Sequence, residues 1–129
     1  MATIQRFEEL EVWQKAREFY QDIVRITQYT AFSKDFELKN QLKASSGSVM
    51  DNIAEGYERD GKKEFVQFLS IAKGSCGESR SQLYRALDNA YISNEEFEIL
   101  RLKTENISKS LSGFIGYLRR SEMTGTKYK

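Results

Sequence analysis

Apolar residues recur at helical spacing along four long stretches of the chain. The stretches cover residues 7–28, 36–58 and 62–90 and the segment that follows Ser93, and in each of them apolar side chains return every three or four positions. This period places them on one face of a helix. The connections between the stretches are short, and the chain has no proline. The pattern therefore predicts an all-α fold, an up-down-up-down antiparallel four-helix bundle.

Local signals mark several of the helix ends. Ser93-Asn-Glu-Glu96 is a capping box, in which a serine and a glutamate three residues later bond free backbone amides at a helix start. The break at residues 59–62 separates the second and third helices, and Asp60 or Gly61 can cap the third. We assign residues 1–120 to one helical domain. Residues 121–129 have few apolar anchors and are expected to form a flexible basic tail.

The first helix carries more apolar surface than contact with one core requires. Leu10, Trp13 and Tyr20 form a seam that we place inward, and a second apolar seam runs through Val12 and Phe19. Because one seam is enough to join the bundle, we predict that Val12 and Phe19 contact another subunit.

Small residues form a stripe on the third helix, opposite its large apolar side chains. The stripe consists of Ser70, Gly74, Gly77 and Ser81. A glycine inside a helix costs roughly 1 kcal/mol relative to alanine, and close approach of another backbone is the usual compensation. Tolerance of small residues on the surface is one interpretation. The other, which we favour, is a homo-oligomer interface, and contact between two different helix faces would close into a ring.

Composition removes most kinds of catalytic site. The 129 residues contain no histidine, which excludes a histidine-based triad, a histidine-ligated zinc and a carboxylate–histidine di-iron site. The single cysteine, Cys76, falls on the apolar stripe of the third helix, where an inert buried thiol is expected. We therefore expect no enzyme activity, no cofactor, no metal and no small-molecule substrate.

The sequence also indicates where in the cell the protein is expected. No apolar run approaches the length that crosses a bilayer, and the N-terminal residues are too acidic and polar for a signal peptide. One cysteine cannot form an internal disulfide. The expectation is a cytoplasmic protein with no membrane partner.

Polar residues run along one border of the apolar face of the second helix. Ser48, Asn52 and Glu55 share this stripe beside Val49 and Ile53. Such groups can bond a neighbouring helix or chain, line a cavity, or form a half-solvated edge with local hydrogen bonds. No nucleophile, base and orienting group come together here, so we favour a structural role over catalysis.

Basic residues are expected to gather at one end of the bundle. In an antiparallel bundle, the turn between the second and third helices lies at the same end as the C-terminus of the fourth. That brings Arg59, Lys62 and Lys63 near Arg119 and Arg120. A ring that repeats this cluster can hold the phosphates of RNA or DNA. An ordinary end of mixed charge is an equal alternative, because acidic residues lie nearby and the net charge is only +1.

Three segments resemble one known family. They are LEVWQKAREF at residues 10–19, QLKASSGSVMDNIAEGYER at 41–59 and KKEFVQFLSIAKGSCGE at 62–78, with N-I-A-E-G as the most specific part. Their order and spacing are similar to those of the proteins encoded in intervening sequences of bacterial 23S rRNA genes. The resemblance implies a four-helix bundle that assembles as a homopentameric ring, with nucleic-acid association as the usual suggested role.

Some positions depart from the pattern of that family. Ser33 and Met50 stand near points where the family usually has proline, and Gly61 stands where a serine often opens the helix. These changes concern loops and caps. The accessory proteins of diversity-generating retroelements look like distant relatives, and those are basic rings that engage nucleic acid and a reverse transcriptase.

The sequence as a whole predicts a non-enzymatic, oligomeric helical protein that acts as a nucleic-acid-associated accessory factor. A protein-binding scaffold and a retroelement accessory protein are the alternatives. The near-zero net charge argues against the last of these.

Overall fold

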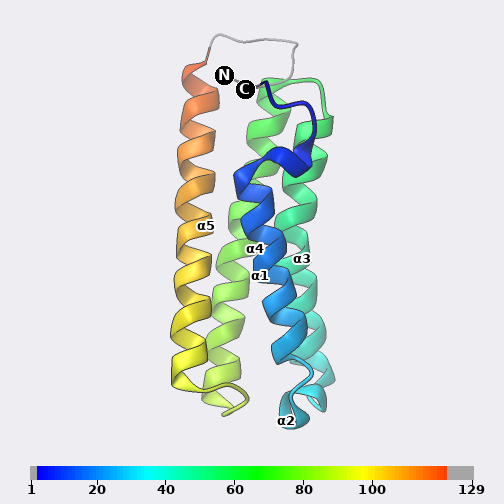
Figure 1. Cartoon of the computed structure of the whole chain (residues 1–129), viewed down its shortest axis with the longest axis vertical. Coiled ribbons are helices and arrows are strands. Elements are labelled where there is room, and N and C mark those ends of the chain that lie inside the picture. The colour runs from blue at the N-terminus through cyan, green and yellow to red at the C-terminus, as the bar shows by residue number, and fades with distance from the viewer. Residues whose placement is uncertain (1–2, 122–129) are drawn as a thin grey trace.

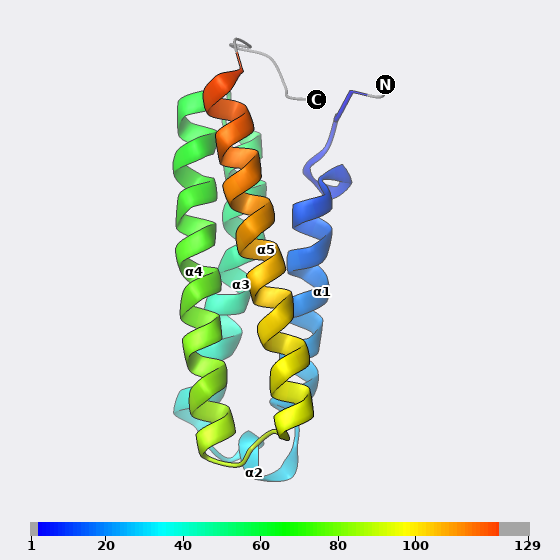
Figure 2. The ribbon, with the colours of Figure 1, turned by 90° about the vertical axis from the view of Figure 1, so that its left-hand side faces the viewer.

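The computed structural model describes residues 3–121, and every regular element in that range is helical. A short 3-10 helix η1 (Phe7–Glu9) precedes α1 (Glu11–Ile26), and α2 (Thr30–Ser33) leads into three long helices. These are α3 (Phe36–Glu58), α4 (Lys62–Asp88) and α5 (Asn94–Arg120). Figures 1 and 2 show α1, α3, α4 and α5 side by side in a bundle. The all-α class is confirmed, whereas the expected tail beyond Ser121 lies outside the described residues.

Each long helix packs against specific neighbours. α3 lies along α4, α4 lies along α5, and α1 packs against both α3 and α5. Figure 1 shows the α3–α4 turn at the same end of the bundle as the C-terminal end of α5, with α2 at the opposite end. No helix in residues 3–121 has the length and apolar character needed to span a membrane.

Helix ends follow the local signals with two exceptions. The side chain of Asp35 accepts a hydrogen bond from the Leu38 amide (3.0 Å) at the start of α3, and Ser93 and Glu96 form the expected capping box of α5. The first helix is shorter than predicted, because Leu10 has extended backbone angles (φ −72°, ψ 124°) and separates η1 from α1. The sequence did not indicate α2, since four residues are too few to show a helical period.

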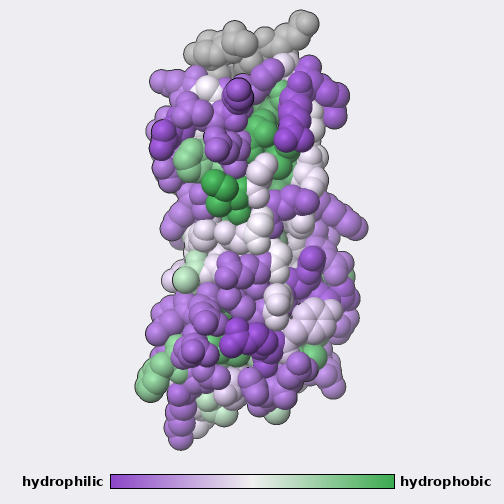
Figure 3. All heavy atoms as spheres, turned by 180° about the vertical axis from the view of Figure 1, so that it is seen from behind, coloured by the Kyte–Doolittle hydropathy of each residue, from purple (hydrophilic) through white to green (hydrophobic). Residues whose placement is uncertain are grey.

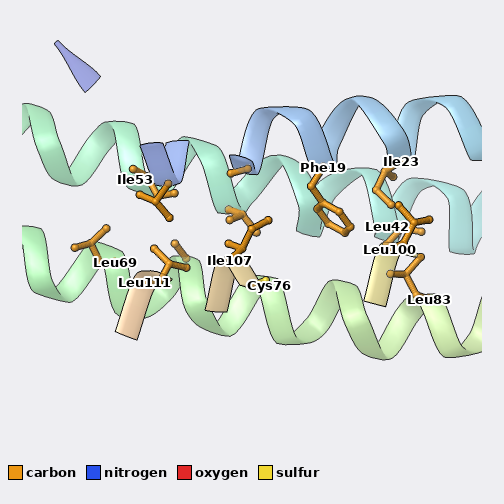
Figure 4. Packing of buried hydrophobic residues seen from close by; sticks show 14 of the residues in the cluster. Phe19, Ile23, Leu42, Ile53, Leu69, Cys76, Leu83, Leu100, Ile107 and Leu111 are labelled. Carbon is orange, nitrogen blue, oxygen red and sulfur yellow. The ribbon is translucent and has the colours of Figure 1, made fainter. Parts of the chain in front are cut away.

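The core runs along the whole bundle axis. Leu42, Ile53, Leu69 and Leu111 are among its fully buried residues, and Figure 4 shows side chains from neighbouring helices meeting there. Val49 and Ile53, which the sequence placed on the apolar face of the second helix, are buried, and so are Leu38, Leu42 and Tyr57.

The assignment of the first helix's two seams was wrong except at Leu10, which is buried as expected (7% exposed). Val12 is 6% exposed and Phe19 is fully buried in the core of the single chain, so neither is available to a second subunit. Trp13 and Tyr20, which the sequence placed inward, are only partly buried. α1 needs a wide apolar arc because it packs against two helices at once, and width alone does not tell which half faces the core.

Candidate functional site

The polar stripe of α3 joins this helix to α4. The hydroxyl oxygens of Ser48 and Ser75 are 2.9 Å apart, and the Asn52 amide donates to both the carbonyl (2.8 Å) and the hydroxyl (2.9 Å) of Ser48. Glu55 lies further out and pairs with Arg59 at 3.1 Å. Ser48 and Asn52 therefore occupy a half-buried contact between helices, and Glu55 forms a surface ion pair.

A fully buried polar cluster continues this contact toward α2. The Ser45 hydroxyl donates to Oε1 of Gln82 (2.6 Å) and lies 2.8 Å from the Ser79 hydroxyl. The three residues are at most 5% exposed. Ser79 is buried on the same helix as Cys76, and the sequence did not pair it with Ser45. The signal was available, since both serines lie on the inward-facing arcs of helices that neighbour each other in the chain.

Gly56, the last residue of N-I-A-E-G, marks a close approach of α3 and α4. A Cβ atom built at this position would lie 2.7 Å from Cβ of Phe68 and 3.0 Å from Cδ1 of Phe65. No side chain fits there without separating the helices. The motif and the serine before it are thus explained by packing: the Ser48 hydroxyl bonds Ser75 across the interface, the Asn52 amide holds Ser48 from within α3, and Gly56 lets the helices meet.

The fold brings the predicted basic residues to one end of the bundle. Lys62 Nζ donates a hydrogen bond to the Ser121 carbonyl, which places the start of α4 beside the end of α5. Arg59 is engaged elsewhere, because it pairs with Glu55 and Glu64 and its guanidinium lies 5.1 Å from the centre of the Phe68 ring. Within residues 3–121, by contrast, the side chains of Lys63, Arg119 and Arg120 form no ion pair.

The small residues of α4 line a shallow groove against α5. Ser70, Gly74 and Gly77 lie on one wall, and α5 supplies Ser112 and Gly116 opposite them. The groove has a volume of about 630 Å³. Ser81, the fourth residue of the predicted stripe, is exposed but is not part of the lining. A Cβ atom added at Gly74 or Gly77 would meet no atom within 4 Å.

Cys76 lies beneath this region in the core and is chemically quiet. Its thiol is 1% exposed and donates to the Thr104 carbonyl at 3.2 Å. Burial raises the pKa of the Cys76 thiol to about 11, so the nucleophilic thiolate is scarce at neutral pH. The described part of the chain also contains no cluster of three or more acidic or cysteine side chains placed to hold a metal ion.

These features define a helical bundle protein whose most distinctive motif serves helix packing, with basic residues at one end and a groove lined by serine and glycine along one side. Within that class, the chain belongs to the 23S rRNA-intervening sequence protein family, whose model matches residues 8–113. The resemblance carried by the three sequence segments is therefore confirmed.

One solved structure extends the comparison. The chain is similar to a protein of unknown function from the S23 ribosomal protein family of Bacteroides thetaiotaomicron VPI-5482. The two share 27% identity with a TM-score of 0.76, over 81% of this chain and 97% of the other. Among curated proteins, none matches the sequence.

Proposed function

We propose that this protein is a non-enzymatic accessory factor that associates with nucleic acid through phosphate contacts at the basic end of the bundle. The observation that carries the proposal is that the start of α4, with Lys62 and Lys63, lies at the same end of the bundle as the end of α5, with Arg119 and Arg120. None of these four cations forms an ion pair with the described residues, so their charge is available to an anionic ligand. The names of the family and of the solved relative, both of which refer to ribosomal components, point in the same direction.

A salt-titrated binding assay with structured RNA tests this function. Phosphate contacts release counterions, so affinity should fall linearly with salt on a double logarithmic scale. Replacing Lys62, Lys63, Arg119 and Arg120 together should abolish most binding. A matched variant that loses four cations elsewhere, Lys15, Lys34, Lys39 and Lys43, should retain it. Absence of binding at low salt, or equal loss in both variants, would remove the basis of the proposal.

The assembly proposed with this function is a ring of up-down-up-down bundles, with five subunits implied by the family resemblance. Support for self-association comes from the outer side of α5, where Ile99 (57% exposed), Leu102 (50%) and Tyr117 fall on one side of the helix at 3.6 residues per turn. Exposed apolar rows of this kind are typical of protein contacts.

Light scattering tests the ring directly. The wild-type mass should be a multiple of the 15.0 kDa chain, and the double variant Ile99→Ser, Leu102→Ser should lower it. Ile71→Ser, an equally polar change at another exposed isoleucine on α4, serves as the control and should leave the mass unchanged. A wild-type mass of one chain would contradict the assembly.

A protein-binding scaffold is the second candidate, and the same apolar row on α5 favours it. In that case the row would contact a different protein and the wild-type chain alone would be a monomer. Cross-linking of the full chain in its host cells would then trap a heterologous complex that is lost in the Ile99→Ser, Leu102→Ser variant. RNA affinity in the salt titration would be absent.

A further inference from the structure

The groove between α4 and α5 is lined by cations as well as by small residues. Lys73 and Arg80 from α4 and Arg119 from α5 stand along it. None of the three forms an ion pair within residues 3–121. No aspartate or glutamate of the described chain lines the groove. The charge of this surface is therefore uncompensated by its immediate surroundings.

The cations extend the basic bundle end along the side of the molecule. Lys73 and Arg80 are seven residues apart on α4, which corresponds to about 10 Å along the helix. Nearer the basic end, Gly116 leaves room for Arg120, whose Nη1 lies 3.1 Å from where a Cβ would stand. Lys62 then follows beside Ser121. A basic track of about 27 Å thus runs from Arg80 to Lys62, as counted along α4.

The floor of the groove is small, polar and free of aromatic rings. Gly74 and Gly77 have nothing within 4 Å of a would-be Cβ, and Ser108 and Ser112 of α5 supply hydroxyl groups. Among residues 3–121, the only apolar residue that lines the groove is Ile115, which is 7% exposed. In the rear view of Figure 3, a pale strip in the middle of the hydropathy scale, where serine and glycine fall, runs between hydrophilic side chains in its lower part and beside hydrophobic ones near its upper end.

This lining distinguishes between two classes of macromolecule. The centres of protein–protein interfaces are enriched in aromatic residues and depleted in charge, and this groove has the opposite composition. A polynucleotide backbone requires hydrogen-bond donors and cations in register with its phosphates, and no apolar anchor. The bare glycines let that backbone approach the helices closely.

We propose that the α4–α5 groove binds the phosphate backbone of a nucleic acid strand, held by Lys73, Arg80 and Arg119 over the Ser/Gly floor. The inference rests on the proposed nucleic-acid association and gives it a path beyond the bundle end. It also means that the small-residue stripe contacts a ligand, whereas the sequence alone suggested contact with a second subunit. Phosphate contacts carry no sequence information, so binding is independent of base sequence.

Fluorescence anisotropy with a labelled single-stranded oligonucleotide tests the groove. Each lost phosphate contact lowers the salt slope by about 0.7 and weakens binding about fivefold at roughly 0.1 M salt. The variant Lys73→Ser, Arg80→Ser should therefore lose about 25-fold in affinity and about 1.4 in slope. The control Lys34→Ser, Lys39→Ser removes the same charge at the opposite end of the bundle and should bind like wild type.

A second variant tests the floor without changing charge. Gly77→Leu places a side chain where the structure leaves space, so the helix should fold normally by circular dichroism. It should weaken oligonucleotide binding at every salt concentration and leave the mass by light scattering unchanged. A lowered mass would identify the stripe as a contact between subunits and overturn the proposal.

Two further measurements separate the groove from the bundle end and from other anions. If Lys62→Ser, Lys63→Ser loses binding while Lys73→Ser, Arg80→Ser does not, the groove fails and the proposed function stands. The reverse result supports the groove and removes the bundle end from the function. Absence of oligonucleotide binding at low salt defeats both. Polyglutamate that competes as well as the oligonucleotide at equal charge would show a site for acidic peptides, and would overturn the assignment to nucleic acid.

Discussion

Two sides of α4 are lined by the same types of small residue, serine and glycine, but one side is packed against α3 and the other is open. On the side facing α3, Ser75 and Ser79 are hydrogen-bonded to serines of α3, and Gly56 of α3 lets Phe68 come into contact. On the side facing the outer edge of α5, a Cβ atom added at Gly74 or Gly77 would meet no atom within 4 Å. Whether a small residue packs against a neighbouring helix or lines an open groove therefore depends on what lies opposite it. The sequence of its own helix does not show which of the two applies.

The closed side is specific because its polar groups are buried. A buried hydroxyl without a partner loses its hydrogen bonds to water, so the pairing of Ser45 with Ser79 and Gln82 sets one register between α3 and α4. In the described residues, no fully buried side-chain nitrogen or oxygen lacks a partner. The open side has no such requirement, since water can reach its hydroxyls.

The largest effect on this contrast is expected at Gly56. Gly56→Ala puts a rigid Cβ 2.7 Å from Cβ of Phe68, and only movement of the two helices can relieve the contact. Overpacking of this kind should lower the free energy of unfolding by about 2–3 kcal/mol. Urea denaturation followed by circular dichroism measures it as a lower midpoint at unchanged slope. An increase in stability would show that the helices are not in close contact at this point.

The sequence predicted that α3 and α4 pack together, but it did not predict the geometry of their contact. The helical period predicted the bounds of α3, Phe36–Glu58, and it placed Ser48 and Asn52 at the border of the apolar face of this helix. It could not reveal that Gly56 meets Phe68, because the same helix propensity penalty attaches to Gly56 and Gly77. Only the rotation of one helix against another distinguishes them, and that depends on the packing of all the core side chains together.

The next effect in size is expected at the buried polar cluster. Ser45→Ala removes the donor to Oε1 of Gln82 and leaves a buried acceptor unpaired, which should lower the free energy of unfolding by about 1–2 kcal/mol. The double variant Ser45→Ala, Gln82→Met removes both partners and should recover part of the loss. If the single and double variants are equally unstable, the hydrogen bond is not the source of the stability.

On the open side, the same kind of change should have the opposite sign. Gly77→Ala meets no atom within 4 Å, so only the better helix propensity of alanine remains. The free energy of unfolding should rise by about 0.5–1 kcal/mol. The same urea titration used for Gly56→Ala measures it, and the pair of variants forms a matched test of the two sides. Destabilisation by Gly77→Ala would indicate that another molecule or subunit packs against this face.

The basic site was predictable in part for the same reasons. An antiparallel order of helices was enough to bring Lys62 toward the end of α5, because it depends only on which ends share a side of the bundle. The groove that continues this charge was not predicted, since Lys73 and Arg80 look like ordinary exposed cations along one helix. They are recognisable as part of a groove only when Ser108 and Ser112 are seen opposite them. In the sequence, these serines are separated from them by about a full helix length.

The smallest effect is expected at a serine of the open side. Ser112 lines the groove, is exposed, and makes no side-chain hydrogen bond to residues 3–121. Ser112→Ala should therefore change the free energy of unfolding by no more than about 0.5 kcal/mol, within the usual range for surface substitutions. Ser45→Ala removes the same hydroxyl from the closed side, so the two urea titrations compare one chemical change in two surroundings. A loss at Ser112 as large as that at Ser45 would mean that the α5 wall of the groove is packed in solution, and that the two sides of α4 are alike after all.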